Sequence, residues 1–235
     1  MIHSVPESST TPSSTPITSG ALAALAPERV FPGRNMSKAD VSLYRIAGSP
    51  IALKDYASRP FLARHTVGRW LIRRECRAYR RAGTLPGLAP FLGRVGSYAL
   101  ATGWVDAVPL ADLAPVAATP ETFDRLDAIV AGLHERGIAV SDLHHRDVLV
   151  SRDGAIHVVD FAAAYVLPAR PGWFSRGVFV RLSAQDRLAA ARMRARFTGS
   201  SETEALAEFD PAAVRLWGAG RRLKAMWDTI RGRRA

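Results

Sequence analysis

The chain has 235 residues, of which 48% are hydrophobic and 23% charged. This is the composition of a globular protein, and it excludes collagen-like, coiled-coil and wholly disordered chains. Lysine and arginine outnumber aspartate and glutamate by 32 to 21, so the net charge is +11. Such a basic balance favours anionic partners, namely nucleotide phosphates, nucleic acid or anionic lipid head groups.

The cysteine content and the hydropathy of the sequence indicate in which cellular compartment the protein is located. Cys76 is the only cysteine, which excludes an internal disulfide and fits a reducing environment. No stretch has the sustained apolar character of a membrane-spanning helix. The first residues lack the basic region that opens a signal peptide. We therefore expect a cytoplasmic protein.

The N-terminal part begins with a Ser/Thr/Pro-rich stretch over residues 1–28, which is typical of a disordered tail. Two short apolar runs follow, Val41–Ile46 and Ile51–Lys54. The intervening Ala47-Gly48-Ser49-Pro50 predicts that they form a β-hairpin.

A long basic helix is predicted over residues 61–82, closed by Gly83. A second pair of strands is predicted over Phe91–Val95 and Ser97–Val105. Strands therefore dominate the first half of the chain.

The second half begins with a helix signal, because Thr119 is a good N-cap and Pro120 suits the first helical position. The helix should end at Gly137. A hairpin follows, with Val148–Val150 and Ala155–Val159 joined by the turn residues 151–154. The chain from about residue 168 is helical and basic. We therefore predict an α+β fold with two lobes.

Three carboxylates gather around the late hairpin. Asp147 precedes its first strand, Asp160 follows its second strand, and Asp142 lies shortly before it. A hairpin brings its open ends together, so Asp147 and Asp160 should be neighbours with Asp142 close by. Carboxylates so placed repel one another unless a cation lies between them, and magnesium takes one or two protein carboxylates together with phosphate oxygens.

The segments Ser141-Asp142-Leu143-His144-His145-Arg146-Asp147-Val148-Leu149-Val150 and Val158-Val159-Asp160-Phe161-Ala162 resemble the catalytic loop and metal-binding motif of the protein-kinase-like superfamily. The resemblance implies that Asp142 orients the attacking hydroxyl. It also implies that Asp147 and Asp160 hold Mg²⁺.

The early hairpin agrees with this resemblance. Ser37–Tyr44 is similar to the compact nucleotide-binding loop of RIO-type kinases, which implies nucleotide contacts at Lys38 and Val41. Ile51-Ala52-Leu53-Lys54 resembles the Val-Ala-Ile-Lys strand, which implies that Lys54 binds the α- and β-phosphates of ATP.

Glu75 is the implied partner of Lys54, and helical spacing supports that role. It is the only acid between Asp55 and Asp106, and the residues three and four positions away are apolar or aromatic: Leu71, Ile72, Ala78 and Tyr79. These positions share a helix face with Glu75. A carboxylate on an apolar face needs a buried partner, which Lys54 could supply.

Taken together, the chain resembles small bacterial RIO-like kinases and kinases of lipopolysaccharide core sugars. The resemblance implies a β-rich N-lobe over residues 29–106 and a reduced helical C-lobe over residues 107–235. It implies ATP and Mg²⁺ as cofactors, ATP lying between the lobes, and a hydroxyl acceptor on a protein Ser/Thr or a lipid-linked sugar.

Departures from the family pattern leave a second interpretation, a pseudokinase that binds RNA, a membrane or a protein through its basic surface. Asp147 replaces an asparagine, Ala162 replaces a glycine, and the nucleotide loop lacks glycines. The basic tail Arg221–Trp227 suits an anionic membrane surface; nucleic acid is less favoured. A third interpretation, a metal hydrolase, draws on four histidines: His134, His144, His145 and His157.

Overall fold

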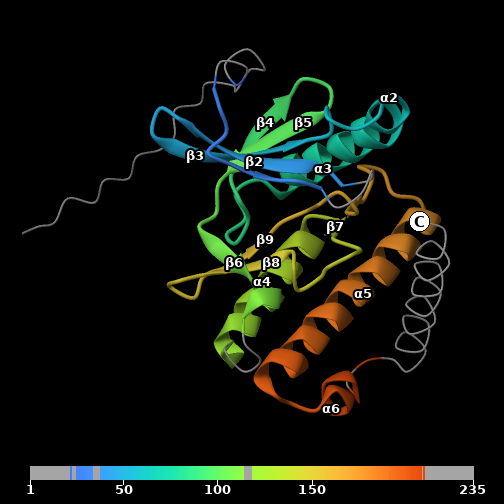
Figure 1. Cartoon of the computed structure of the whole chain (residues 1–235). Helices are drawn as coiled ribbons and strands as arrows, with labels where there is room; N and C mark the ends of the chain where they lie inside the picture. The colour runs from blue at the N-terminus through green and yellow to red at the C-terminus, as the bar shows by residue number, and fades with distance from the viewer. Residues whose placement is uncertain (1–21, 23–24, 34–37, 114–117, 208, 210–235) are drawn as a thin grey trace, which may run out of the picture. The chain divides into compact units, whose positions relative to one another are not determined.

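The computed structural model describes residues 22, 25–33, 38–113, 118–207 and 209. Most of the predicted disordered tail and the whole basic tail Arg221–Trp227 lie outside these residues. The fold is α+β as predicted, with β-sheet in the N-terminal half and helices in the C-terminal half (Figure 1). The chain divides into two compact units: the first runs to Arg69 and includes Leu92–Trp104, and the second contains Trp70–Phe91 and the chain from Val105.

The first unit is built on a five-stranded sheet in the order β1-β2-β3-β5-β4. Its strands are β1 (Arg29–Phe31), β2 (Asp40–Ile46), β3 (Ser49–Asp55), β4 (Phe91–Val95) and β5 (Ala99–Gly103). Alternate residues of β3 are buried, and Ile51 and Leu53 pack with Val95, Ala99 and Ala101 in a small core.

The hairpin predicted around residues 41–54 is confirmed, with a tighter turn. Ile46 pairs with Ser49, so the strands continue to a two-residue turn at Ala47 and Gly48. Both residues have positive φ, 47° and 82°. That backbone matches the twist of the flanking strands, which explains why Ser49 and Pro50 join β3 instead of the turn.

The helix predicted over residues 61–82 is present but divided into three parts: α2 (Phe61–Ala63), the π-helical η1 (Arg64–Gly68) and α3 (Arg69–Ala82). A Cβ on Gly68 would lie 2.8 Å from the Cβ of the buried Tyr56, so only glycine permits this approach. Gly83 follows α3 with φ +63°. The contacts group most of α3 with the second unit, whereas the sequence-based division assigns it to the first domain.

Among the described residues, the second unit combines two small sheets with several helices, which include most of α3. The three-stranded sheet has the order β6-β8-β9, and the two-stranded sheet pairs β10 with β7. The elements are η2 (Leu110–Asp112), α4 (Pro120–Glu135), α5 (Trp173–Thr198), α6 (Glu202–Ala207), β6 (Ala107–Pro109), β7 (Ile138–Ala139), β8 (Val148–Ser151), β9 (Ile156–Val158) and β10 (Tyr165–Val166).

Helices α4 and α5 lie side by side over the hydrophobic core of this unit (Figure 1). Phe123, Leu126 and Leu133 of α4 are buried in that core, as the helical periodicity indicates. The predicted start and stop of α4 are both confirmed, with Thr119 as its N-cap and Gly137 in the left-handed conformation just beyond its end. Among the described residues, no helix is long and apolar enough to cross a membrane.

Candidate functional site

The open end of the β8–β9 hairpin positions two of the predicted site residues. Val148 pairs with Val158, and the Val159 N–H donates to the Asp147 carbonyl over 2.9 Å. Asp147 and Asp160 therefore leave the sheet at the same end of the hairpin. This is the arrangement that the sequence predicts, and it follows from the turn at residues 151–154.

The backbone at Asp160 adopts a conformation that non-glycine residues rarely take. Its φ is +66°, and its Oδ1 accepts a hydrogen bond from the Ala162 N–H over 3.3 Å. Left-handed backbone at a non-glycine residue persists only where the surroundings hold it, and it concentrates at functional sites. The buried ring of Phe161, edge-on to Tyr79 at 5.0 Å, anchors the chain directly after Asp160.

Helix α3 holds this same segment with two neighbouring side chains. Glu75 is 2% exposed, and its Oε1 accepts a hydrogen bond from the Phe161 N–H over 3.3 Å. Arg74 donates to the Ala163 carbonyl over 2.5 Å and to the Ala164 carbonyl over 2.7 Å. Burial lowers the pKa of Arg74. Glu75 is thus as buried as its helical spacing predicts, whereas Arg74 was not singled out because it is one of many arginines.

The segment leading to Asp142 is held by a buried carboxylate of α5. Asp186 is 1% exposed; its Oδ2 accepts from the Val140 N–H over 2.7 Å and its Oδ1 from the Ser141 N–H over 2.8 Å. His134 Nε2 lies 3.0 Å from Asp186 Oδ2. Ser141 has φ +70°, so its backbone also needs external support. Asp142 itself is exposed at the end of this supported segment.

Asp186 is a functional candidate that the sequence analysis missed, although a signal was present. It is the only acid between Asp160 and Glu202, and Leu182 and Ala190 flank it at helical spacing. The same pattern identified Glu75. A lone acid on an apolar helix face accordingly indicates a buried carboxylate that accepts backbone hydrogen bonds.

In the first unit, the sheet orders the residues predicted to contact a nucleotide. Lys54 of β3 is opposite Val41 of β2 and Leu100 of β5, so apolar side chains flank it on its own face of the sheet. The Lys38 carbonyl accepts a hydrogen bond from Arg59 Nε over 2.9 Å. Val41 and Lys54 are therefore direct cross-strand neighbours, and Lys38 lies just before β2.

Two aspartates face each other at the end of this hairpin, Asp40 opposite Asp55. Burial raises the pKa of Asp40, but hydrogen bonds from Ser58 and the Gly33 N–H, with the Arg59 guanidinium, outweigh burial and lower the pKa overall. Burial raises the pKa of Asp55, and the charge of Asp40 adds to that effect. At this end of the sheet, the surroundings therefore stabilise the ionised form of Asp40 and destabilise the ionised form of Asp55.

The histidines do not form the metal site that the hydrolase interpretation requires. The rings of His144 and His145 lie close together, with their centroids 3.9 Å apart. The chain turns here, since the Asp147 N–H donates to the His144 carbonyl over 2.8 Å. Within the described residues, no three or more His, Cys, Asp or Glu side chains are grouped so that they could hold a metal ion.

The residues present nevertheless fit the Mg²⁺ that the resemblance implies. Asp147 and Asp160 supply hard carboxylate oxygens from the same hairpin end, and one or two protein carboxylates suffice for Mg²⁺ that is also bound by phosphates. Asp142 does not combine with them into one three-carboxylate metal group.

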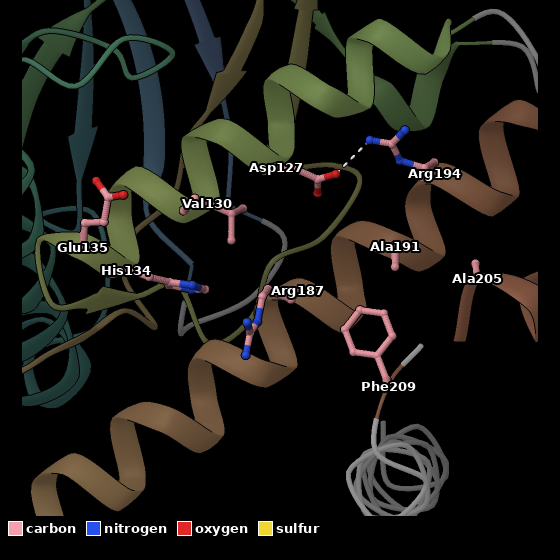
Figure 2. A pocket seen from close by; sticks show the side chains of 10 residues that line it. Asp127, Val130, His134, Glu135, Arg187, Ala191, Arg194, Ala205 and Phe209 are labelled. Atoms are coloured by element: carbon pink, nitrogen blue, oxygen red, sulfur yellow. Dashed lines mark hydrogen bonds and ion pairs between the residues drawn. The ribbon is translucent and has the colours of Figure 1, made fainter. Parts of the chain in front are cut away.

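A cavity of about 740 Å³ lies between α4, α5 and α6, and Asp142, Asp147 and Asp160 are not among its lining residues. Figure 2 shows the His134 ring directed toward Arg187 across this cavity, with the Asp127–Arg194 ion pair at its side. His134 thus contacts both the cavity and Asp186, the residue that holds the segment before Asp142.

No protein-family model matches the chain, and a search of curated proteins finds no match.

Proposed function

We propose that the protein is an ATP-dependent phosphotransferase with a protein-kinase-like fold, which moves the γ-phosphate of ATP to a hydroxyl acceptor. One observation carries the proposal: the buried Glu75 carboxylate of α3 accepts a hydrogen bond from the N–H of Phe161, the residue after Asp160. This hydrogen bond links the helix glutamate to the backbone next to Asp160, whose own backbone has a left-handed conformation. The arrangement supports the roles that the motif resemblance assigns to Glu75 and Asp160.

In the proposed reaction, Asp142 orients the acceptor hydroxyl and accepts its proton. The hydroxyl oxygen forms a bond to the γ-phosphorus while the bond from that phosphorus to the bridging oxygen breaks, and ADP leaves. Asp147 and Asp160 would hold Mg²⁺, which supplies charge neutralisation on the phosphates. Lys54 would bind the α- and β-phosphates, and Lys38 and Val41 would contact the nucleotide. Catalysis would come mainly from positioning and electrostatics.

The acceptor is proposed as a class, a protein serine or threonine or a lipid-linked sugar such as those of the lipopolysaccharide core. The net charge of +11 suits an anionic acceptor of either kind. The proposed location is cytoplasmic, with peripheral contact to the inner face of the membrane.

The test is thermal melting of the full chain with ATP, with and without Mg²⁺. A ligand that binds only the folded state increases the free energy of unfolding and so raises the melting temperature. At a ligand concentration one hundred times the dissociation constant, the free energy of unfolding rises by about 2.7 kcal/mol. We expect a Mg²⁺-dependent rise for the natural sequence and none for Asp160→Ala. Glu135→Ala is the matched control, because it removes an exposed carboxylate at the end of α4.

Phosphate release from ATP, followed in the same samples, separates catalysis from binding. A Mg²⁺-dependent melting shift together with turnover that Asp142→Asn abolishes supports the phosphotransferase. A shift without turnover would instead indicate the pseudokinase. The absence of any shift at millimolar ATP would overturn the proposed nucleotide site.

A further inference from the structure

The first two turns of α5 present large apolar side chains to solvent. Trp173 is 86% exposed, Phe174 67% and Val180 63%. An isolated exposed apolar residue is ordinary, but three on the first eight residues of one helix make a patch. Such patches mark surfaces that bind another molecule.

Helical geometry places these residues on one continuous face. At about 100° per residue, the positions Arg176, Val180, Trp173, Gly177, Arg181 and Phe174 follow one another around an arc of about 160°. All six residues are exposed, whereas Ser175, Val178, Phe179 and Leu182 on the opposite side are partly buried. We name these six residues the α5 face. Val180, Trp173 and Gly177 form its centre, Arg176 lies at one end of the arc, and Arg181 lies next to Phe174 at the other end.

The charge around the α5 face has one sign. Between Asp160 and Asp186 the chain contains no acidic residue but three exposed arginines: Arg170, Arg176 and Arg181. The Arg176 Nε donates a hydrogen bond to the Pro171 carbonyl over 3.3 Å. This bond holds the Arg176 side chain near the N-terminal end of α5. The surface therefore combines apolar groups with positive charge that no neighbouring acid along this segment neutralises.

We propose that the α5 face docks the protein onto an anionic membrane surface. Indole and phenyl rings partition into the head-group region of a bilayer, and arginines beside them pair with lipid phosphates. An in-plane helix with an apolar centre and basic flanks is the arrangement that binds such a surface. This inference does not depend on the proposed phosphotransfer, since it uses none of the residues of that site.

The composition of the α5 face favours lipid over nucleic acid. Proteins that bind single-stranded nucleic acid without sequence preference use a basic groove with aromatic side chains on which the bases stack. The centre of the α5 face instead includes the aliphatic Val180 and the exposed Gly177, which provide no aromatic platform on which a base could stack.

The experiment is co-sedimentation of the full chain with vesicles of equal parts phosphatidylglycerol and phosphatidylcholine, beside vesicles of phosphatidylcholine alone. We expect binding to the anionic vesicles only. Trp173→Ser with Phe174→Ser should weaken it about tenfold or more, through lost apolar burial. Arg176→Glu with Arg181→Glu should weaken it on the order of twentyfold. All four positions are exposed, so melting midpoints should stay unchanged.

Two matched controls make the result specific. Arg73→Glu with Arg77→Glu changes the net charge equally on exposed positions of α3, and Val108→Thr alters an exposed apolar residue of β6. Both controls should retain binding within about threefold. Equal loss in the α3 control would overturn the proposal in favour of net charge alone. Loss of binding to a single-stranded RNA, with vesicle binding unchanged, in the Trp173/Phe174 variant would overturn it in favour of a nucleic-acid surface.

Discussion

At the scale of single residues, the second unit depends on two buried carboxylates that accept backbone hydrogen bonds. Glu75 accepts from the residue after Asp160, and Asp186 accepts from the two residues before Asp142. A buried carboxylate is costly unless its oxygens are satisfied, so each one fixes the backbone that satisfies it. Asp186 thereby holds the backbone directly before the exposed Asp142, and Glu75 holds the backbone directly after Asp160.

Asp186→Asn tests this arrangement, because an amide cannot accept at both ends. We expect it to cost about 1.5–3 kcal/mol per hydrogen bond lost and to remove the exchange protection of the Val140 and Ser141 amides. Hydrogen exchange and melting measure both effects, and ATP turnover should fall while the Mg²⁺–ATP melting shift persists. Asp127→Asn, which affects only an exposed pair with Arg194, should cost less than about 1 kcal/mol. Retained protection at Ser141 would contradict the positioning role.

Asp40 and Asp55 make a second test at this scale, because their pKa shifts have opposite signs. The lowered pKa of Asp40 means that its stabilisation is complete above the aspartate value of about 3.9 and is lost as the pH falls through the folded-state pKa. The raised pKa of Asp55 means that protein stability is lost as the pH rises from that value through the folded-state pKa.

Asp40→Asn should therefore lower the melting temperature at pH 7, and Asp55→Asn should raise it. The Asp55→Asn difference should shrink as the pH falls through the raised folded-state pKa toward the ordinary aspartate value, whereas the Asp40→Asn difference should shrink only below that value, as the pH falls through the lowered folded-state pKa. Melting curves of both variants across this range check the signs. A pH-independent difference would show that packing, and not charge, determines the effect.

At the scale of elements, the sequence predicts helix ends and hairpins correctly where nearby residues along the chain determine them. The Thr119-Pro120 start and the Gly137 end of α4 were predicted because caps and breakers act within a few residues. The hairpin register that brings Asp147 and Asp160 to the same end of the β8–β9 hairpin likewise follows from the turn between the two strands. The short strands β1, β6, β7 and β10 were missed, because two or three residues carry no period and form only where a distant strand pairs with them.

The break in the helix over residues 61–82 shows the same limit. Local propensity does not predict the π-helical segment Arg64–Gly68, and the sequence does not show that Gly68 at its end lies against Tyr56. Helix propensity depends on residues that are close along the chain, whereas the final conformation also depends on tertiary packing, which overrides propensity.

Two helix glycines give a matched prediction at this scale. Alanine is the better helix former by about 1 kcal/mol, so propensity alone favours both Gly68→Ala and Gly177→Ala. A Cβ at Gly68 would meet Tyr56 at 2.8 Å, whereas a Cβ at Gly177 has no heavy atom within 4 Å. We expect Gly68→Ala to destabilise by about 1–3 kcal/mol and Gly177→Ala to stabilise by about 0.5–1 kcal/mol. Urea unfolding measures both, and a stabilising Gly68→Ala would contradict the close approach.

At the scale of the whole molecule, the dominant feature is the excess of positive charge. The chain carries a net charge of +11, and the cations in salt bridges among the described residues include Arg45, Arg59, Arg192 and Arg194. Most of these pairs are at least partly exposed, where each contributes little. The same excess that attracts phosphates therefore opposes the compact state through self-repulsion.

Sodium chloride should consequently stabilise the free protein. Raising the ionic strength from 0.01 to 0.15 M shortens the screening length from about 30 to about 8 Å, and we expect a gain of about 1 kcal/mol, or ~2–4 °C in melting temperature. Arg73→Glu with Arg77→Glu replaces two exposed cations by anions, so this variant should gain less. Differential scanning calorimetry of both proteins measures the difference. A melting temperature that falls with salt would mean that attractive ion pairs outweigh the repulsion, and binding of phosphates would then have to be explained by the local sites alone.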